Sequence, residues 1–375
     1  MKNKIIFYAF FILLAAPVLT FPFLKNHIDS ENHEKREFAK MPKFTLRSAD
    51  AFPEEFDTYF NDNLPYKNQL VLLDNIKNDL LDEGSVLLKY FSKTTAIRGK
   101  NKWLFYNSVS SGEETMRDYL RDNLYTEEEM EEIARHYTML QQKLDSMGIE
   151  MAVLYAANKE QVYPEYMPDG IVPKGSVSRT DQLAGYIREH TDVPLLYTKE
   201  ALLEEKKNHQ VFYKYDTHWN QLGGFVGTQV VNEHFHGEYV SLDDVSCRVA
   251  QEGKSGDLAD LLSMRVLCQD DVEWEIEGYK PEVTYEMTES DGYYRCTSNA
   301  EDERSVLMLM DSFGYAMMGM AKDFAKVTFA NQTDSFREYC ETERPDIVLI
   351  EIVERRKPMQ EEWCKGLYDL LEQEE

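Results

Sequence analysis

The chain has 375 residues, with 68 acidic against 41 basic side chains and a formal net charge of −27. So negative a charge argues against nucleic acid and against a face that docks on anionic lipid, and we interpret the acidity as a solvated surface. The length is ample for a complete core and exceeds that of one average domain.

The N-terminus carries an apolar segment. An uncharged run at 5–24 follows Lys2 and Lys4 and ends at Lys25. About 20 apolar residues suffice to cross a bilayer core of roughly 30 Å, which predicts an uncleaved signal anchor. Its basic flank would stay inside, so the rest of the chain would face outward. A cleaved signal peptide without a clean cleavage motif is the alternative, and a buried globular helix is a third.

The segments that follow the anchor, taken as residues 1–25, have separate patterns. Residues 26–50 are polar and irregular, which is typical of a linker. The span 51–375 is expected to form one large domain, with two modest domains as the alternative. Helical spacing of apolar residues begins at Pro53, and Pro65 divides it into two helices. A turn that feeds a short strand is predicted at 98–106.

An alternation of strands and helices begins at Thr126 and Glu129, which form a capping box. Strands separated by helices favour an α/β fold with a mostly parallel sheet and right-handed crossovers. Residues 240–300 are acidic and Tyr-rich, and we interpret them as an insertion near the site. The strands are predicted at 151–156, 193–197, 306–310, 327–330 and 346–353, and further helices at about 178–190, 222–235, 315–324 and from 358 onward.

Two short segments carry the side chains needed for nucleophilic catalysis. Asp216 and His218 lie two positions apart, and Ser312 follows the predicted strand at 306–310. Reactive groups of parallel sheets lie at the carboxyl ends of strands. A serine becomes nucleophilic when a histidine accepts its proton and an acid orients the imidazole. The amides of Phe313 and Gly314, together with that of Ser312, are candidate oxyanion donors. If these groups converge, they predict acyl transfer or ester cleavage.

These residues also have structural interpretations. A serine at a helix start, such as Ser312, is most often an N-cap. Asp216 and His218 could join His234 or His236 in a site for a divalent ion. We predict no metal and no cofactor.

Two further residues are candidates for contact with the substrate. Asn158 follows a predicted strand and could donate its side-chain amide to an oxyanion, although a turn-forming asparagine is an equal alternative. Trp219 could stack on a sugar ring or pack in the core. Glu354 and Arg355, at a strand end, are interpreted as a structural ion pair.

The five cysteines form no C-x-x-C motif, which argues against a zinc knuckle or a thioredoxin-type site. Outside the cell, one disulfide among Cys247, Cys268 and Cys296 remains open. The odd number leaves at least one free thiol.

Short motifs are spread over nearly the whole chain beyond the apolar segment: Asn32 with Arg36 and Pro42, Phe56-x-x-Tyr59-Phe60-x-Asp62, Arg98-Gly99-Lys100-Asn101-x-Trp103-Leu104-Phe105, Asn158-Lys159-x-x-Val162-Tyr163-Pro164-Glu165-x-x-Pro168, Asp216-Thr217-His218-Trp219-Asn220, Gly256-Asp257-Leu258-Ala259, Asp311-Ser312-Phe313 and Pro345-Asp346-x-Val348 with Glu354-Arg355. In this order they resemble the DHHW family and the alginate O-acetyltransferases, which have an SGNH-hydrolase-like domain. The Asp-x-His and Trp-Leu-Phe segments are the most specific.

The resemblance implies a three-layer SGNH-hydrolase-like domain of circularly permuted order, in which Asp216 and His218 precede Ser312. It implies that Ser312 is the nucleophile that carries the acetyl group, His218 the general base and acid, and Asp216 the residue that holds the histidine. Met310 stands before Asp311 where the family often has glycine, and Lys67 stands where arginine is more usual.

The resemblance also implies a biological role. The acceptor would be a cell-envelope or secreted polysaccharide, and a membrane-bound acyltransferase of the MBOAT type would supply the acetyl group. The protein would be held in the cell membrane by its N-terminal helix, with the catalytic domain outside the cytoplasm, or be secreted if the signal is cleaved. The alternatives are an acetyl esterase with the same triad and a non-catalytic glycan-binding or scaffold component of an export complex.

Overall fold

The computed structural model describes residues 38–43, 51–63, 96–108, 113–290, 293–331 and 334–373. The predicted anchor at 1–25 and the Lys67 position lie outside these ranges. No helix within the described ranges is both long and apolar enough to cross a bilayer. The chain divides into two compact units, Met1–Ser85 with Ala259–Leu267, and Val86–Leu258 with Cys268–Glu375.

The smaller unit contains helix α2 (Phe52–Asp62), which begins where helical spacing predicts it. Pro53 stands in the first turn, where its missing N–H costs no hydrogen bond. The Phe56 ring stacks on that of Phe52 at a centroid distance of 5.8 Å.

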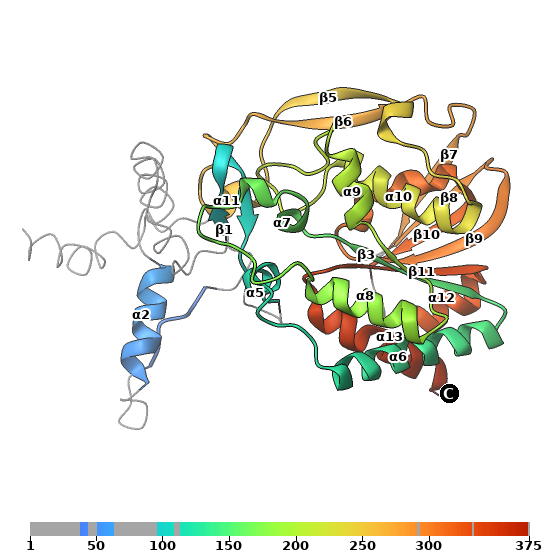
Figure 1. The fold of residues 1–375 in the computed structure, drawn as a ribbon, viewed down its shortest axis with the longest axis horizontal. Coiled ribbons are helices and arrows are strands. Elements are labelled where there is room, and N and C mark those ends of the chain that lie inside the picture. Colours follow the sequence, from blue (N-terminus) through green and yellow to red (C-terminus); the bar gives the residue numbers. More distant parts are fainter. Residues whose placement is uncertain are drawn as a thin grey trace, which may run out of the picture. The chain divides into compact units, whose positions relative to one another are not determined.

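A seven-stranded mixed sheet forms the centre of the larger unit (Figure 1). Its first five strands are mutually parallel, as the strand–helix alternation predicts. The sixth strand is antiparallel to the fifth, and the seventh is antiparallel to the sixth. The antiparallel pair lies within the segment interpreted as an insertion. The order is β4 (Leu195–Tyr197), β3 (Glu150–Ala156), β11 (Ile347–Val353), β9 (Asp302–Leu309), β10 (Phe324–Ala330), β8 (Tyr293–Ser298) and β7 (Tyr285–Ser290).

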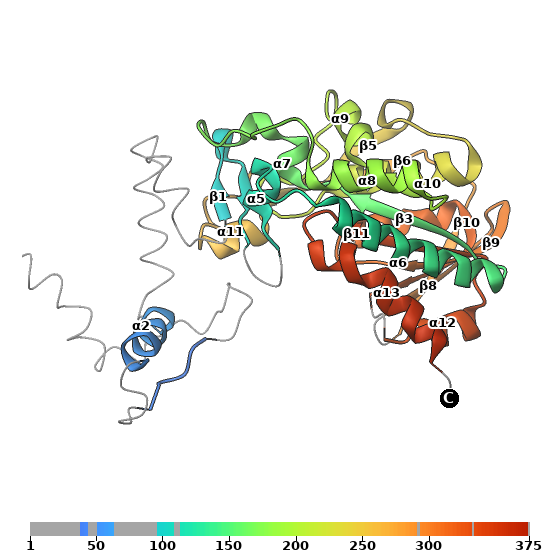
Figure 2. The ribbon, with the colours of Figure 1, turned by 60° about the horizontal axis from the view of Figure 1, so that its bottom comes forward.

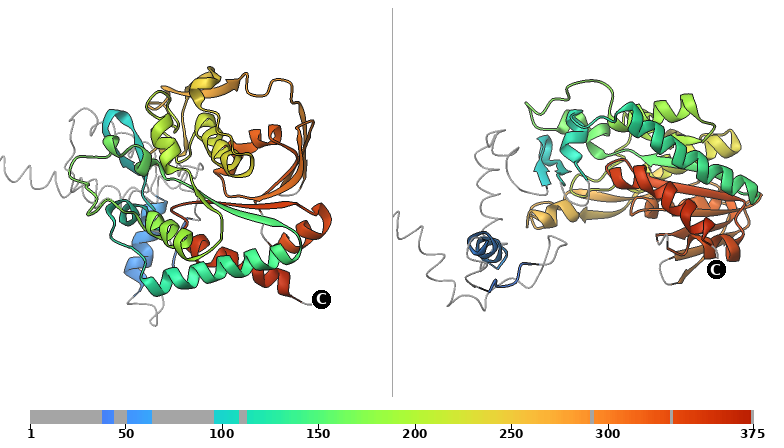
Figure 3. Two further views of the ribbon diagram at one scale, coloured as in Figure 1. Left: turned by 45° about the vertical axis from the view of Figure 1, so that its right-hand side comes forward. Right: turned by 90° about the horizontal axis from the view of Figure 1, so that it is seen from below.

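Helices cover both faces of this sheet, which gives the three layers that the resemblance implies (Figures 2 and 3). Because both faces are buried, the central strands are continuous apolar runs. In β3, Ala152 and Leu154 join one core while Met151 and Val153 join the other. One face packs against α6 (Glu127–Ser146), α8 (Arg179–His190), α12 (Phe336–Glu343) and α13 (Lys357–Glu372), and the other against α9 (Lys199–Glu205), α10 (Gln221–His236) and the 3₁₀ helix η5 (Gly314–Lys322).

The remaining elements are short. The turn and strand predicted at 98–106 form a hairpin, and a separate two-stranded ribbon pairs β5 with β6. All five cysteines are free, so the disulfide considered among three of them is absent. These elements are β1 (Ala96–Arg98), η2 (Lys100–Lys102), β2 (Leu104–Tyr106), α5 (Thr115–Leu120), α7 (Lys159–Val162), η3 (Pro164–Tyr166), η4 (Leu242–Asp244), β5 (Ser246–Lys254), α11 (Asp257–Leu261) and β6 (Asp271–Glu277).

One local signal in the sequence is confirmed, because the Thr126–Glu129 capping box is present at the start of α6. The predicted helix at 315–324 is instead the 3₁₀ helix η5, which packs closely on α10. A Cβ added to Gly224 of α10 would lie 2.3 Å from the carbonyl oxygen of Ala316 in η5. Only glycine allows this approach of the two backbones.

We therefore expect Gly224→Ala to destabilise the fold by about 1–3 kcal/mol, because α10 must move away from η5. The free energy of unfolding in urea measures this change. The control is Gly185→Ala in α8, where an added Cβ meets no atom within 4 Å. That variant should be neutral or more stable by up to about 1 kcal/mol, since alanine is the better helix former. Equal losses in the two variants would contradict the close packing of α10 on η5.

Candidate active site

The carboxyl ends of three neighbouring parallel strands carry the candidate site. Asn158 follows β3, Arg355 follows β11, and Ser312 follows β9 just before η5. Asp216 and His218 come from residues 213–218, which we call the histidine loop and which precede α10. The parallel topology thus brings together segments that lie far apart in the sequence.

Asp216, His218 and Ser312 form one continuous chain of hydrogen bonds. His218 Nδ1 lies 2.6 Å from Asp216 Oδ1, and His218 Nε2 lies 2.8 Å from Ser312 Oγ. An ionised carboxylate only accepts hydrogen bonds, so the network assigns the ring hydrogen to Nδ1. Nε2 is then the acceptor for the Ser312 hydroxyl. In this arrangement an imidazole can take the proton of a serine.

Several hydrogen bonds fix the carboxylate of Asp216. Oδ1 also accepts from the backbone N–H of His218 at 3.0 Å, and Oδ2 accepts from that of Asp257 at 3.1 Å. Burial by itself raises the pKa of Asp216. The hydrogen bonds and charge of His218 and the Asp257 amide outweigh burial and hold the pKa well below its ordinary value. Asp216 therefore stays ionised, as the orientation of the imidazole requires.

Asp257 supports the histidine loop and was not identified from the sequence. Its carboxylate accepts hydrogen bonds from the Thr217 amide at 2.8 Å and from the Thr217 hydroxyl at 2.9 Å. Gly256, just before it, leaves room for the loop, because a Cβ there would lie 2.5 Å from Asp216 Cβ. The Gly-Asp motif marked this position in the sequence, but no chemistry distinguished its role.

Asp216, His218 and Asp257 also bring potential metal-ligand atoms within 4.8 Å of one another. The hydrogen assigned to His218 Nδ1, however, leaves that atom without a lone pair for an ion, and the carboxylates of Asp216 and Asp257 already accept hydrogen bonds from neighbouring groups. Neither alternative ligand joins this group: His236 Nε2 bonds to Asp302 Oδ2 at 2.9 Å, and the His234 ring packs edge-on against Phe235.

The turn at Ser312 is braced by Asp311. The Phe313 amide donates to Asp311 Oδ1 at 2.9 Å, and the Gly314 amide donates to the Asp311 carbonyl at 3.2 Å. Two of the three amides predicted as oxyanion donors are therefore engaged inside the turn. For the amide of Ser312, no acceptor is present among the described residues.

Asn158 offers a second donor. Its Oδ1 accepts from Arg355 Nη1 at 3.4 Å, whereas its buried Nδ2 has no hydrogen-bond partner in the described part of the chain. The Arg355 contact fixes which way the amide points. The side-chain amide of Asn158 and the backbone amide of Ser312 are thus the donors that can bind an oxyanion.

Met310, at the position where the resemblance leads us to expect glycine, is buried. A Cβ on Gly314 would lie 2.5 Å from the Sδ of Met310, so the larger side chain fills the space that Gly314 leaves. Next to it, Glu351 Oε2 accepts the Asp311 amide at 3.1 Å. Burial first, and then the charge of Asp311, raise the pKa of Glu351 well above its ordinary value. A neutral Glu351 avoids two adjacent negative charges under the turn.

Of the two interpretations of Trp219, core packing is the one that the structure bears out: the residue is 1% exposed and donates its indole N–H to the Phe313 carbonyl at 2.9 Å, so it offers no face to a sugar. The interpretation of Glu354 and Arg355 as an ion pair needs correction, because the two do not pair with each other. The Tyr197 hydroxyl donates to Glu354, while the Arg355 guanidinium lies 5.0 Å from the Phe313 ring.

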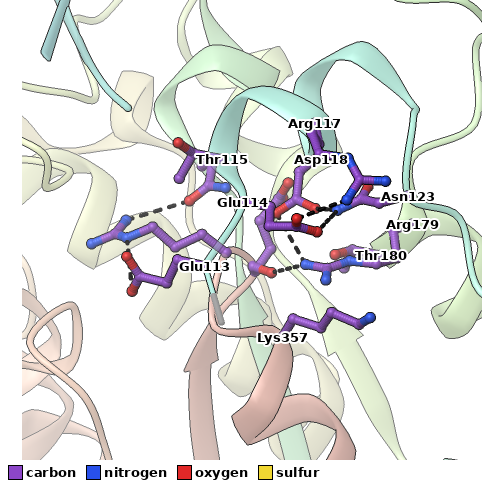
Figure 4. Close-up of polar contacts among 12 residues, drawn as sticks. Glu113, Glu114, Thr115, Arg117, Asp118, Asn123, Arg179, Thr180 and Lys357 are labelled. Atoms are coloured by element: carbon purple, nitrogen blue, oxygen red, sulfur yellow. Dashed lines mark hydrogen bonds and ion pairs between the residues drawn. The ribbon is translucent and has the colours of Figure 1, made fainter. Parts of the chain in front are cut away.

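A buried polar cluster lies next to Glu354, and Figure 4 shows the side chains that meet at Asp118. Arg179 Nη2 donates to Asp118 Oδ2 at 3.0 Å and to the Glu354 carbonyl at 3.2 Å, and Asn123 donates to Asp118 Oδ1. Burial raises the pKa of Asp118 to about 6 despite the charge of Arg179. The same cause raises the pKa of Glu354 to about 7. The cluster ties α5 and α8 to the end of β11.

Comparisons with known proteins agree with this architecture. The model of the family described as ALGX, "SGNH hydrolase-like domain, acetyltransferase AlgX", matches residues 96–291, which is just over half of the chain. This range includes Asn158, Asp216 and His218 and ends before Ser312. No curated protein matches the sequence.

Solved structures similar to this chain include a DHHW family protein from Eubacterium siraeum, with a TM-score of 0.51 and 15% identity over 67% of this chain and 92% of that one. Bacillus cereus PatB1 with a sulfonyl adduct has a TM-score of 0.49 and 16% identity, over 70% and 96% of the two chains. The O-acetyltransferase domain of Pseudomonas putida AlgJ has a TM-score of 0.48 and 16% identity, over 74% and 99%. The likeness to the DHHW protein supports the fold.

Proposed function

This chain belongs to the AlgX family of SGNH hydrolase-like acetyltransferase domains, and from that premise we propose that it is an O-acetyltransferase acting on a polysaccharide. The observation that carries the proposal is the unbroken hydrogen-bond chain from Asp216 through His218 to Ser312. Ser312 is exposed, so an acyl donor can reach its hydroxyl. The acid and histidine precede the serine in the chain, as in a circularly permuted SGNH domain.

The proposed reaction has two half-reactions. Ser312 Oγ attacks the carbonyl carbon of an acetyl ester or thioester while His218 Nε2 takes the hydroxyl proton. Collapse of the tetrahedral adduct breaks the bond to the leaving group, which receives the proton from His218. A sugar hydroxyl then attacks acetyl-Ser312, His218 takes its proton, and that proton returns to Ser312 Oγ as the acetylated sugar leaves.

The developing oxyanion would be held by the backbone amide of Ser312 and the side-chain amide of Asn158, which bond to no acceptor in the described part of the chain. We expect Asn158→Asp to lower kcat by roughly 10²–10³-fold with little change in KM, because the donor acts only in the transition state. Steady-state kinetics with p-nitrophenyl acetate measure this. A variant that changes KM alone would show that Asn158 binds substrate and does not stabilise the oxyanion.

The remaining parts of the proposal concern the cellular setting. The apolar run at 5–24 would hold the catalytic domain outside the cytoplasm as an uncleaved anchor, or direct secretion if it is cleaved. The acceptor would be a cell-envelope or secreted polysaccharide. A membrane-bound acyltransferase of the MBOAT type would bring the acetyl group across the membrane.

The exposure of Ser312 favours one second candidate, an acetyl esterase that uses water as acceptor. Release of p-nitrophenol from p-nitrophenyl acetate, with and without an oligosaccharide acceptor, separates the two activities. A transferase should form acetylated oligosaccharide, detected by mass spectrometry, at the expense of free acetate. Free acetate alone with every acceptor offered would identify an esterase. Wild-type protein that releases no p-nitrophenol and forms no acetylated oligosaccharide would favour a non-catalytic scaffold role.

A further inference from the structure

Lys159 is a buried lysine that the proposed reaction does not use. The residue is only 3% exposed to solvent. It begins α7, directly after Asn158 and three residues beyond the end of β3. Burial of an ammonium is costly unless its donors are satisfied. Its partners therefore indicate what it does.

All three donors of this ammonium point at the histidine loop. Lys159 Nζ donates to the backbone carbonyls of Tyr213 at 3.0 Å, Lys214 at 3.2 Å and Asp216 at 2.6 Å. An ammonium has three hydrogens, so these three carbonyls use its full capacity. Nζ makes no ion pair with a carboxylate among the described residues.

The histidine loop depends on such a donor because it has no regular secondary structure. Buried carbonyls outside helices and sheets need other partners. The Tyr215 carbonyl accepts from the Leu258 amide at 3.0 Å, and the Lys214 carbonyl also accepts from the Leu104 amide at 3.0 Å. For the carbonyls of Tyr213 and Asp216, Lys159 is the sole donor within the described ranges.

The surroundings of Lys159 maintain its charge at neutral pH. Its Nζ lies 5.7 Å from the centroid of the Trp103 ring and 5.5 Å from that of Phe105, close enough for cation–π attraction. Burial lowers the pKa of Lys159 to about 8, against the opposing charges of Asp216, Asp257, Asp271 and Glu160. At pH 7 the folded protein therefore keeps most of its Lys159 protonated.

We propose that Lys159 is a positioning residue that holds the backbone of the histidine loop so that Asp216 and His218 stay aligned with Ser312. The adjacent Asn158 carries the candidate oxyanion amide, so one short segment after β3 would set both the base and the oxyanion donor. This inference rests on the proposed function of the triad.

The first test is Lys159→Met, which keeps the length of the side chain and removes its donors. Misplacement of catalytic groups by about 1 Å costs roughly 10²-fold in rate, so we expect kcat with p-nitrophenyl acetate to fall by about that factor while KM changes little. The matched control is Lys206→Met. Lys206 also binds a carbonyl, that of Val162 at 2.5 Å, and lies 5.0 Å from the Tyr163 ring, but it touches no part of the histidine loop in the described contacts. Its kcat should match the wild type.

A double-mutant cycle with Asp216→Asn distinguishes positioning from general support of the fold. If Lys159 acts through the Asp216–His218 pair, Lys159→Met should cost less than about threefold in kcat once Asp216 is already impaired. The same loss of about 10²-fold in both backgrounds would overturn the proposal. If Lys159→Met does not fold, Lys159→Gln, which retains two donor hydrogens, replaces it in the cycle.

The two hypotheses fail in different ways. Full activity of the Asp216→Asn single variant would contradict the proposed catalytic triad itself. An inactive Asp216→Asn variant with multiplicative losses in the cycle would leave the triad standing and remove only the role of Lys159.

Discussion

Ser312→Ala should abolish acetyl transfer, with kcat falling by roughly 10⁴–10⁶-fold, because the variant lacks the hydroxyl that forms the proposed covalent intermediate. The Ser312 side chain is exposed and bonds to His218 Nε2, so the variant should fold as the wild type does. Acetylated oligosaccharide, measured by mass spectrometry, reports the loss. Circular dichroism checks the fold.

The control for this variant is Ser146→Ala, which removes an exposed hydroxyl at the end of α6. Its activity should equal that of the wild type. Wild-type rates in Ser312→Ala would refute covalent catalysis by this serine, whatever the geometry of its neighbours.

Asp216→Asn should lower kcat by roughly 10³–10⁴-fold, because an amide no longer fixes the tautomer in which His218 Nε2 accepts the serine proton. KM should change little, since no step of substrate binding uses Asp216. The matched control is Asp243→Asn, which alters another Asp–His pair: Asp243 Oδ1 lies 2.8 Å from His209 Nε2 on the surface. That control should keep full activity, and a comparable loss there would mean that the effect is not specific to the site.

The same variant tests the electrostatic account of Asp216. Its pKa lies below the ordinary value of 3.8 in the folded protein, so the ionised carboxylate stabilises the fold at pH values above that. This stabilisation is lost as the pH falls through the range between the ordinary and the folded pKa. The free energy of unfolding of the wild type, relative to Asp216→Asn, should therefore decrease on acidification below about pH 4. A difference that stays constant with pH would contradict the depressed pKa.

The residues of the proposed triad could be predicted from the sequence because their signals are local. Asp216 and His218 are separated by one residue, and Ser312 follows closely on an apolar run that predicts a strand. The parallel part of the sheet follows from the alternation of strands and helices. These features can be recognised without knowing any long-range contact. That the three side chains meet follows from the parallel sheet, in which reactive groups gather at the carboxyl ends of the strands.

The supporting residues could not be predicted because their contacts are distant in sequence. Lys159 lies 54 residues before Tyr213, and Asp257 lies 40 residues after Thr217. The side chain of Asp311 binds an amide that the sequence left open as an oxyanion donor, a detail of turn geometry. No composition or periodicity distinguishes a lysine that binds carbonyls from one on the surface.

The antiparallel edge of the sheet was missed for a different reason. The sequence places Asp291-Gly292 between β7 and β8, and Asp-Gly between strand-like runs is a strong hairpin signal. The acidic and Tyr-rich composition of 240–300 suggested an insertion and obscured this signal. The β8 strand instead pairs with β10 and extends the central sheet.

The most direct measurement is the identification of the acetylated residue. Wild-type protein is mixed with p-nitrophenyl acetate, quenched in acid within the first turnover, digested and analysed by peptide mass spectrometry. The account predicts one acetyl group on Ser312, which disappears when an oligosaccharide acceptor is added before the quench. Acetyl transfer that proceeds with Ser312 unmodified, or with the acetyl group on a different residue, would contradict it.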